Sequence, residues 1–270
     1  MKAAGIIRSQ SRAALKGNWV AAVAGVFTLL AFIFLGVFIY SLLILSSGAF
    51  DANDNLRHGA EPVLLAVLCL SFLLIFALTP IKNGVFRMFY NLSENKKCEL
   101  SDAFYFFNRN LYFKTIAFNA LTALKLALNI LIGLSPYIIC SVICEFFSDV
   151  ILTTVSANEI LETVKIILLS LGFAAAAVLS LRLLVTEFLY GAQLSERPFT
   201  ETKLMLKGHS ADLFKLFISF ILWILLCFFV LPIFYVIPYF LTSFATSTKW
   251  LFKLYKEGTR YDYNNRSYSL

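Results

Sequence analysis

A lysine inside a long apolar stretch is the residue with the clearest potential for chemistry. Lys125 is the only charged residue among the 30 residues 115–144. Asn119 and Thr122 precede it by six and three residues and Asn129 follows by four, so a helix would place all four on one face. A charged side chain at the centre of a membrane helix costs roughly 2.5–3.5 kcal/mol and usually faces the interior of a bundle. This polar stripe therefore predicts an internal polar cavity or a contact with a substrate.

A purely structural role for these residues stays open. Lys125 can extend toward the membrane surface or pair with a neighbouring carboxylate, for which Glu187 is a candidate. Arg182 and Glu187 are secondary candidates for a site, although a spacing of five residues is poor for a direct contact on one helix. The alternative for these two is an interfacial anchor and its neighbour.

Motifs for catalysis or metal binding are missing from the sequence. It contains no HExxH, no P-loop, no GxGxxG and no GxSxG. The two histidines, His58 and His209, fall in connections expected on opposite sides of a membrane. The five cysteines are odd in number and include no CxxC pair. We therefore expect no enzyme activity, no cofactor and no metal site.

The composition shows which surroundings the chain needs. Of its 270 residues, 60% are apolar and only 14% are charged, and the mean hydropathy is +0.80. Soluble domains carry about 25% charged residues. A soluble enzyme, a nucleic-acid-binding domain and a disordered chain are thereby excluded as expectations. The composition predicts an all-α, polytopic membrane protein that forms a single domain over residues 1–270.

Six transmembrane helices, arranged as three consecutive hairpins, fit the apolar stretches. Val20–Leu45 is uncharged over 26 residues, which is too long for the core of a signal peptide. Pro62 suits the first turn of the second span, and Pro80 suits its end. The expected spans are residues 20–45, 62–81, 111–144, 160–190, 213–231 and 238–254. The fifth and sixth follow from dividing the 33 uncharged residues 216–248, which exceed one crossing.

Three further features complete the expected architecture. The division between the last two spans is expected at Ile233–Ile237, where two prolines bracket the chain. Short amphipathic helices are expected on the inner surface, one at Ala103–Phe107 with Ser101 as its N-cap and one at Thr200–Lys207. The small residues from Gly172 to Ala177 would let neighbouring helices approach closely, which predicts a central position for the fourth span.

The distribution of charge predicts the orientation. With the N-terminus inside, the inner segments hold four basic residues before residue 19, six in 82–114, five in 182–215 and five after 248, which is 20 of 23. The positive-inside rule then places both termini, and the polar tail 256–270, in the cytoplasm.

Several short motifs resemble one family. The opening Arg12–Trp19 resembles the start of the DUF975 family of bacterial integral membrane proteins, and Gly208 with Leu213–Leu216, Trp223 and Pro238-Tyr239 resembles its C-terminal signature. The resemblance implies a six-helix protein of the bacterial cell membrane with no assigned function. It carries over no catalytic residues.

Two functions fit these observations. The first is a non-enzymatic scaffold or accessory subunit, with membrane lipids and other membrane proteins as partners and no nucleic acid. The alternative is a small transporter or permease for a lipid-like or amphipathic solute, which would pass along the polar stripe around Lys125. The environment of Lys125 distinguishes the two, because a transporter needs it to line a solvent-connected cavity.

Overall fold

The chain folds into helices that form two compact units. The computed structural model describes residues 2–50, 57, 59–96, 98–146, 155–229 and 232–267. The first unit comprises Met1–Asn119 and Val185–Leu270, and the second comprises Ala120–Leu184. The helices in chain order are α1 (Lys2–Leu15), α2 (Trp19–Ser46), α3 (Glu61–Ala77), α4 (Pro80–Ser93), the 3₁₀ helix η1 (Leu100–Phe107), α5 (Arg109–Phe146), α7 (Val155–Gly191), α8 (Pro198–Met205), α9 (Ser210–Leu226), the 3₁₀ helix η2 (Cys227–Phe229) and α10 (Ile233–Ser267).

Five helical segments of the described chain are long and apolar enough to cross a membrane. They are Trp19–Ser46, Glu61–Ser93, Arg109–Phe146, Ile160–Gly191 and Ser210–Phe229. The all-α class is confirmed, and these segments indicate a multi-pass membrane protein. The expected sixth span corresponds to α10, which is not among the five.

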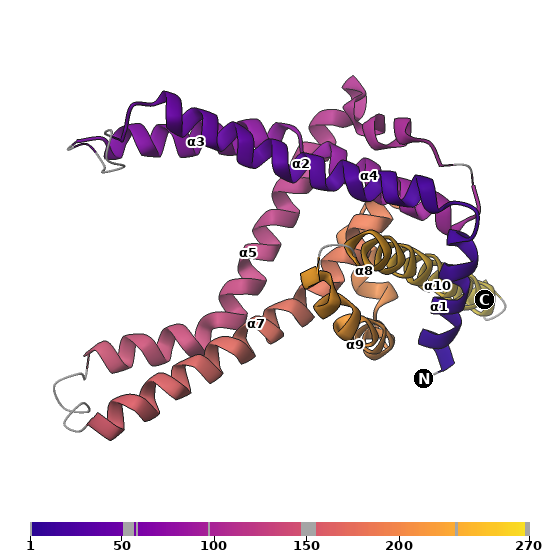
Figure 1. Ribbon diagram of the computed structural model, residues 1–270. Helices are drawn as coiled ribbons and strands as arrows, with labels where there is room; N and C mark the ends of the chain where they lie inside the picture. The colour runs from indigo at the N-terminus through magenta and orange to yellow at the C-terminus, as the bar shows by residue number, and fades with distance from the viewer. Residues whose placement is uncertain are drawn as a thin grey trace. The chain divides into compact units, whose positions relative to one another are not determined.

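Helix α10 is enclosed by other helices of the first unit along its middle part. It packs against α1, α2, α4, α8 and α9 (Figure 1). Its middle buries five hydroxyl side chains, Thr242, Ser243, Thr246, Ser247 and Thr248. Thr242, Thr246 and Thr248 each donate a hydrogen bond to the carbonyl four residues earlier, at 2.8–2.9 Å. Small side chains whose hydroxyls bond within their own helix allow the surrounding helices to approach closely. A helix enclosed by protein does not need an apolar surface toward lipid, so α10 need not be as apolar as the five segments.

The prolines act partly as the sequence suggests. Pro62 lies in the first turn of α3, and Pro80 begins α4 after α3 has ended at Ala77. The expected division at Ile233–Ile237 is wrong, because these residues form the first turns of α10. Pro238 lies inside α10, close to the N-terminal end of that helix. Its ring is compatible with the helical φ angle, and because proline has no backbone N–H, one helical hydrogen bond is missing there.

The segment before α5 forms η1 instead of an independent α-helix. Its N-cap is Glu99, whereas the sequence suggested Ser101. The backbone N–H of Glu99 donates to Asp102 Oδ2 at 3.3 Å, which completes a capping box. Ala103 and Phe106 are fully buried, and η1 packs directly on α4.

The expected polar tail 256–270 is helical as far as Ser267, where it continues α10.

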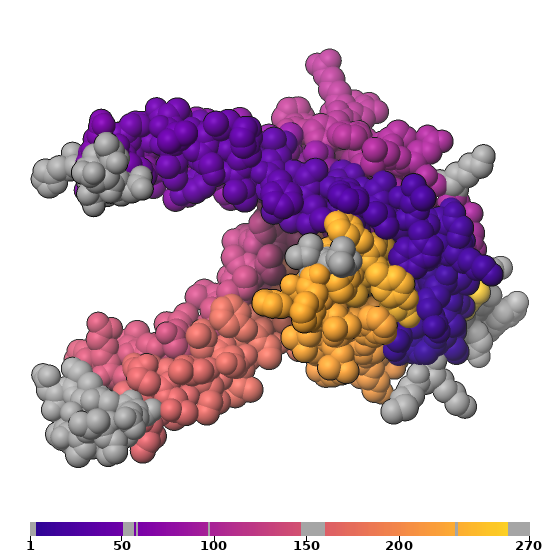
Figure 2. All heavy atoms as spheres, in the orientation of Figure 1, coloured from indigo at the N-terminus to yellow at the C-terminus, as the bar shows by residue number. Residues whose placement is uncertain are grey.

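The second unit is built on a close contact between α5 and α7. A Cβ on Gly133 would lie 2.7 Å from the Gly172 carbonyl oxygen and 2.8 Å from Ala176 Cβ. Further along, Cys144 lies close enough to Lys165 to interact with it electrostatically. The two helices therefore run antiparallel and side by side (Figure 1, Figure 2). Of the small residues from 172 to 177, only Gly172 and Ala176 are buried, so within the second unit this patch forms the contact of α7 with α5.

Candidate functional site

A group of polar and charged side chains lies in the first unit, around α4, and two of them, Asn83 and Glu187, are buried. Lys82 and Glu187 form an ion pair, with Nζ 2.6 Å from Oε1. Arg87 stacks on the ring of Tyr105, with its guanidinium carbon 3.9 Å from the ring centroid. Asn83 lies beside these residues on α4 and is fully buried. We call these five residues the polar cluster.

Close backbone contacts position the polar cluster. Gly84 on α4 lies against the backbone of Ala103 in η1, which leaves no space for a side chain. Gly191, the last residue of α7, lies against the same helix, since a Cβ there would be 3.0 Å from the Asn83 carbonyl oxygen. Two glycines thus bring η1 and α7 directly onto α4, and the cluster occupies the junction.

The polar cluster has unused hydrogen-bonding capacity. Among the described residues, no partner is found for either side-chain polar atom of Asn83, for Arg87 Nε or for Glu187 Oε2. Leaving a buried polar group unpaired costs about 1–3 kcal/mol. Such groups commonly bind an ordered water, which makes about three hydrogen bonds in a buried site. Asn83, Arg87 and Glu187 therefore keep donors and acceptors that no described side chain satisfies.

A second set of hydrogen bonds ties the beginning of α5 to its neighbours. Asn119 donates from Nδ2 to Thr79 Oγ1 at 3.0 Å. Tyr112 donates to the Ala77 carbonyl oxygen at 3.0 Å, and the hydroxyls of Thr115 and Tyr190 lie 2.9 Å apart. Asn119, expected in the polar stripe, therefore fixes the position of α5 in the first unit.

The other members of the polar stripe lie in the second unit and differ in exposure. Thr122 is buried, Asn129 is half-buried and Lys125 is exposed. Because α5 and α7 are antiparallel, moving toward the N-terminus of α5 corresponds to moving toward the C-terminus of α7. Lys125 lies eight residues before Gly133, and the corresponding level on α7 is that of Arg182. Two basic residues on neighbouring helices thus occupy the same level of the second unit.

The secondary candidates are also separated. Glu187 belongs to the first unit, where its partner is Lys82, which sequence reasoning did not name. Arg182 belongs to the second unit and is exposed.

A comparison with families of related sequences covers nearly the whole chain. The family model described as "Protein of unknown function (DUF975)" matches residues 1–252. The chain belongs to this family. No curated protein and no solved structure matches this chain. The DUF975 match confirms the resemblance found in the sequence and includes every residue of the polar cluster.

Sequence reasoning missed most of the polar cluster in this DUF975 protein. Lys82, Asn83 and Arg87 follow Pro80, the expected end of the second span, in a segment of mixed polarity that the sequence alone does not mark as a site. The available signal was Asn83-Gly84 inside a helix, because both residues disfavour a helix interior and indicate a packing or functional demand there. No group of three His, Cys, Asp or Glu side chains that could hold a metal ion occurs in the described part of the chain.

Cys98, between α4 and η1, gives a local probe of this DUF975 fold. Its thiol donates to the Met88 carbonyl oxygen at 3.2 Å. Burial, together with the nearby Asp102 carboxylate, raises the pKa of Cys98 to about 11. The thiolate is the reactive form, so folding lowers the reactivity of this cysteine.

We expect Cys98 to be alkylated at least about tenfold more slowly at pH 8 in the folded protein than in denatured protein, after allowing for the greater nucleophilicity of a high-pKa thiolate. The measurement is iodoacetamide labelling of a variant whose other four cysteines are alanine. The folded rate should still increase between pH 9 and 11, where an exposed control thiol at Lys16→Cys approaches its plateau. Equal rates for the folded and denatured protein would contradict the prediction.

Proposed function

We propose that this protein is a non-enzymatic scaffold or accessory subunit, whose second unit binds another integral membrane protein. The observation that carries the proposal is the exposure of α5. Only 6% of its most apolar 18-residue window is buried inside the chain, compared with 22% for α2. Within the second unit, α5 and α7 therefore leave a long apolar surface uncovered.

The packing inside the second unit supports this role. The close contact between α5 and α7 depends on Gly133, Gly172 and Ala176. Large apolar side chains, including Leu131, Ile132 and Leu171, point away from it and are 58–61% exposed. Lipid provides no hydrophobic driving force between helices, so association depends on shape and on polar contacts. The exposed apolar side chains of the second unit supply the shape, and the basic residues Lys125 and Arg182 supply the polar contacts.

The level shared by Lys125 and Arg182 supports one placement in the bilayer. Residues 126–144 of α5 are 19 uncharged residues, which reach about 28 Å and match a hydrocarbon core of about 30 Å. On α7, the uncharged residues 166–181 end at the same level. We propose that Lys125 and Arg182 mark the inner boundary of the membrane. The transporter alternative gains no support from this placement, which assigns Lys125 to the headgroup region.

The full topology belongs to the same proposal. We propose six spans in the bacterial cell membrane, with α10 as the sixth, both termini in the cytoplasm and η1 and α8 along the inner surface. The support is the excess of basic residues in the inner segments together with the enclosure of α10 by other helices. Cysteines introduced at Asn55 and Ser267 in a cysteine-free chain test it. An impermeant maleimide should label only Asn55→Cys in intact cells, and labelling of Ser267→Cys would overturn the topology.

Photo-crosslinking in native membranes tests the scaffold function. A photoreactive amino acid at Leu131, Ile132 or Leu171 should give one discrete crosslinked protein band, identified by mass spectrometry. The matched control is Phe228, which is 88% exposed but lies in η2, outside the second unit. A second copy of this chain as the partner would indicate self-assembly in place of an accessory role. Crosslinks to lipid alone at all three positions would overturn the proposal.

A further inference from the structure

A cavity in the first unit has the size and lining of a ligand site. It has a volume of about 540 Å³ and lies where α1, the end of α4 and α10 meet. Ligand sites are commonly about 300–1,000 Å³. The cavity contains none of the residues of the polar cluster, so it is a separate site.

The charged groups of the lining are both positive. Lys249 and Lys253 are four residues apart on α10, so they share one face of the helix. No carboxylate is among the described lining residues. Glu257 lies 3.8 Å from Lys253, but both side chains are well exposed and such a pair is weak.

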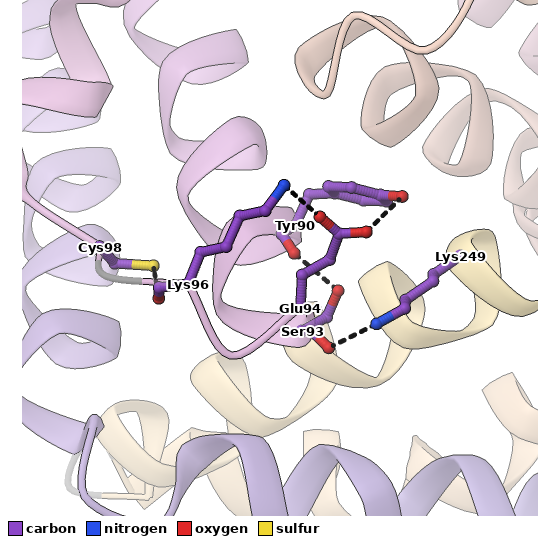
Figure 3. A network of polar contacts seen from close by, with 6 residues as sticks. All are labelled: Tyr90, Ser93, Glu94, Lys96, Cys98 and Lys249. Carbon is purple, nitrogen blue, oxygen red and sulfur yellow. Dashed lines mark hydrogen bonds and ion pairs between the residues drawn. The ribbon is translucent and has the colours of Figure 1, made fainter.

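The carboxylate closest in sequence to the cavity lining is that of Glu94, and it already contacts two other side chains. Glu94 follows Ser93 at the end of α4 and lies 2.5 Å from the Lys96 ammonium and 3.5 Å from the Tyr90 hydroxyl (Figure 3). Lys249 instead donates to the backbone carbonyl oxygen of Ser93, at 3.3 Å (Figure 3). An ammonium has three donors, so this contact orients Lys249 and leaves donors for a ligand.

Neutral groups complete the lining. Asn95 adopts a left-handed conformation, with φ at 55°, where the chain turns away from α4, and its amide is exposed at the cavity. Gln10 of α1 contributes a second exposed amide. Trp250 is half-buried, with its ring 5.4 Å from the His209 ring, and together with Ala13 it gives the cavity an apolar wall. The lining thus combines two cations, several neutral donors and an aromatic surface.

We propose that this cavity binds a phosphate-bearing anion. Its phosphate would lie between Lys249 and Lys253, and its uncharged part would lie against Trp250. Two ammonium groups with neutral donors suit an anion with several oxygens, since charge-assisted hydrogen bonds to phosphate are strong. The same chemistry occurs in the headgroup of an anionic phospholipid and in a soluble phosphate ester. The inference depends on the first unit alone and holds whether or not the second unit binds a partner.

Binding measurements on the full-length protein in detergent test the proposal. The probes are a short-chain phosphatidylglycerol, its zwitterionic phosphatidylcholine counterpart, and glycerol 3-phosphate. The variant Lys249→Gln/Lys253→Gln should bind phosphatidylglycerol roughly 25-fold more weakly, or about fivefold for each lysine near an anionic headgroup. The control Lys16→Gln/Lys256→Gln changes the net charge equally outside the cavity and should retain the affinity.

A competition experiment between phosphatidylglycerol and glycerol 3-phosphate shows whether the bound phosphate belongs to a lipid or to a soluble ester. Displacement of phosphatidylglycerol by glycerol 3-phosphate would assign a soluble ester, and no displacement would assign a lipid headgroup. Ala13→Phe fills the cavity without changing the charge, so it should weaken binding even if the lysine variant fails to fold. Equal losses in the cavity and control variants would show a general electrostatic effect and overturn the proposal. Equal affinities of the wild-type protein for the two lipids would also overturn it.

Discussion

Replacing Gly84 by alanine is expected to destabilise the first unit more than the same replacement at any other described glycine of that unit. An added Cβ would lie 2.0 Å from the Ala103 carbonyl oxygen and 2.4 Å from its carbonyl carbon. These atoms belong to the backbone of η1 and cannot rotate away. Ala103 is itself fully buried, so η1 would have to separate from α4. We expect a loss at the upper end of about 1–3 kcal/mol in the free energy of unfolding, or more.

The measurement for Gly84→Ala is the unfolding midpoint in mixed detergent micelles. Cys98 adds a local readout, because separation of η1 from α4 should increase its rate of alkylation. Gly5→Ala is the matched control, since nothing lies within 4 Å of a Cβ at that position in α1. Alanine there should leave the midpoint unchanged or raise it slightly, because alanine favours helices over glycine. Equal behaviour of the two variants would show that α4 and η1 are not in close contact.

Breaking the ion pair of the polar cluster is expected to have an asymmetric effect. The Glu187 side chain is 8% exposed, whereas Lys82 is 31% exposed. Lys82→Met leaves a buried carboxylate without its cation, and loss of one partner of a buried pair costs about 3–5 kcal/mol. Glu187→Gln leaves an ammonium that can turn toward a polar surface, so its cost should be smaller, at about 1–2 kcal/mol.

A double-mutant cycle tests this asymmetry. The double variant Lys82→Met/Glu187→Gln should be more stable than Lys82→Met alone, because the second change removes the unpaired charge. Lys165→Met is a suitable control, since its ion pair with Glu162 is 2.8 Å long but the carboxylate is 66% exposed. Its effect should not exceed about 1 kcal/mol. Additive effects of Lys82→Met and Glu187→Gln would exclude direct coupling.

The sequence predicts the bounds of those helices whose ends are marked by charged residues or by proline. The first span was expected at 20–45, and α2 covers Trp19–Ser46, because the uncharged run has basic residues before it and small polar residues after it. Pro62 and Pro80 likewise marked the second span, since each restricts the backbone locally. Boundaries set by such local chemistry can be read without tertiary information.

The elements inside the first unit could not be read in this way. The sequence marks the segment before residue 19 only by its four basic residues, although Ser11 and Leu15 on one face of α1 are fully buried. The signal was their spacing of four residues, but basic residues on the other face obscured it. Lys82 gave no indication of its partner, because Glu187 is 105 residues away and the pair exists only through tertiary packing. The sequence likewise does not relate Lys125 to Arg182, because their shared level depends on the register of α5 with α7.

The enclosure of α10 has a consequence for the order in which this protein can be completed. Leu15 and Leu92 are buried in α1 and α4, and both helices pack against α10, the last helix of the chain. Between Leu92 and Thr242 the ribosome adds 150 residues, which takes roughly 8–30 s at about 5–20 residues per second. The earlier helices are thus held without their central neighbour for that time. A truncated product that ends before residue 233 would keep all five candidate spans and still lack the helix that fills its core.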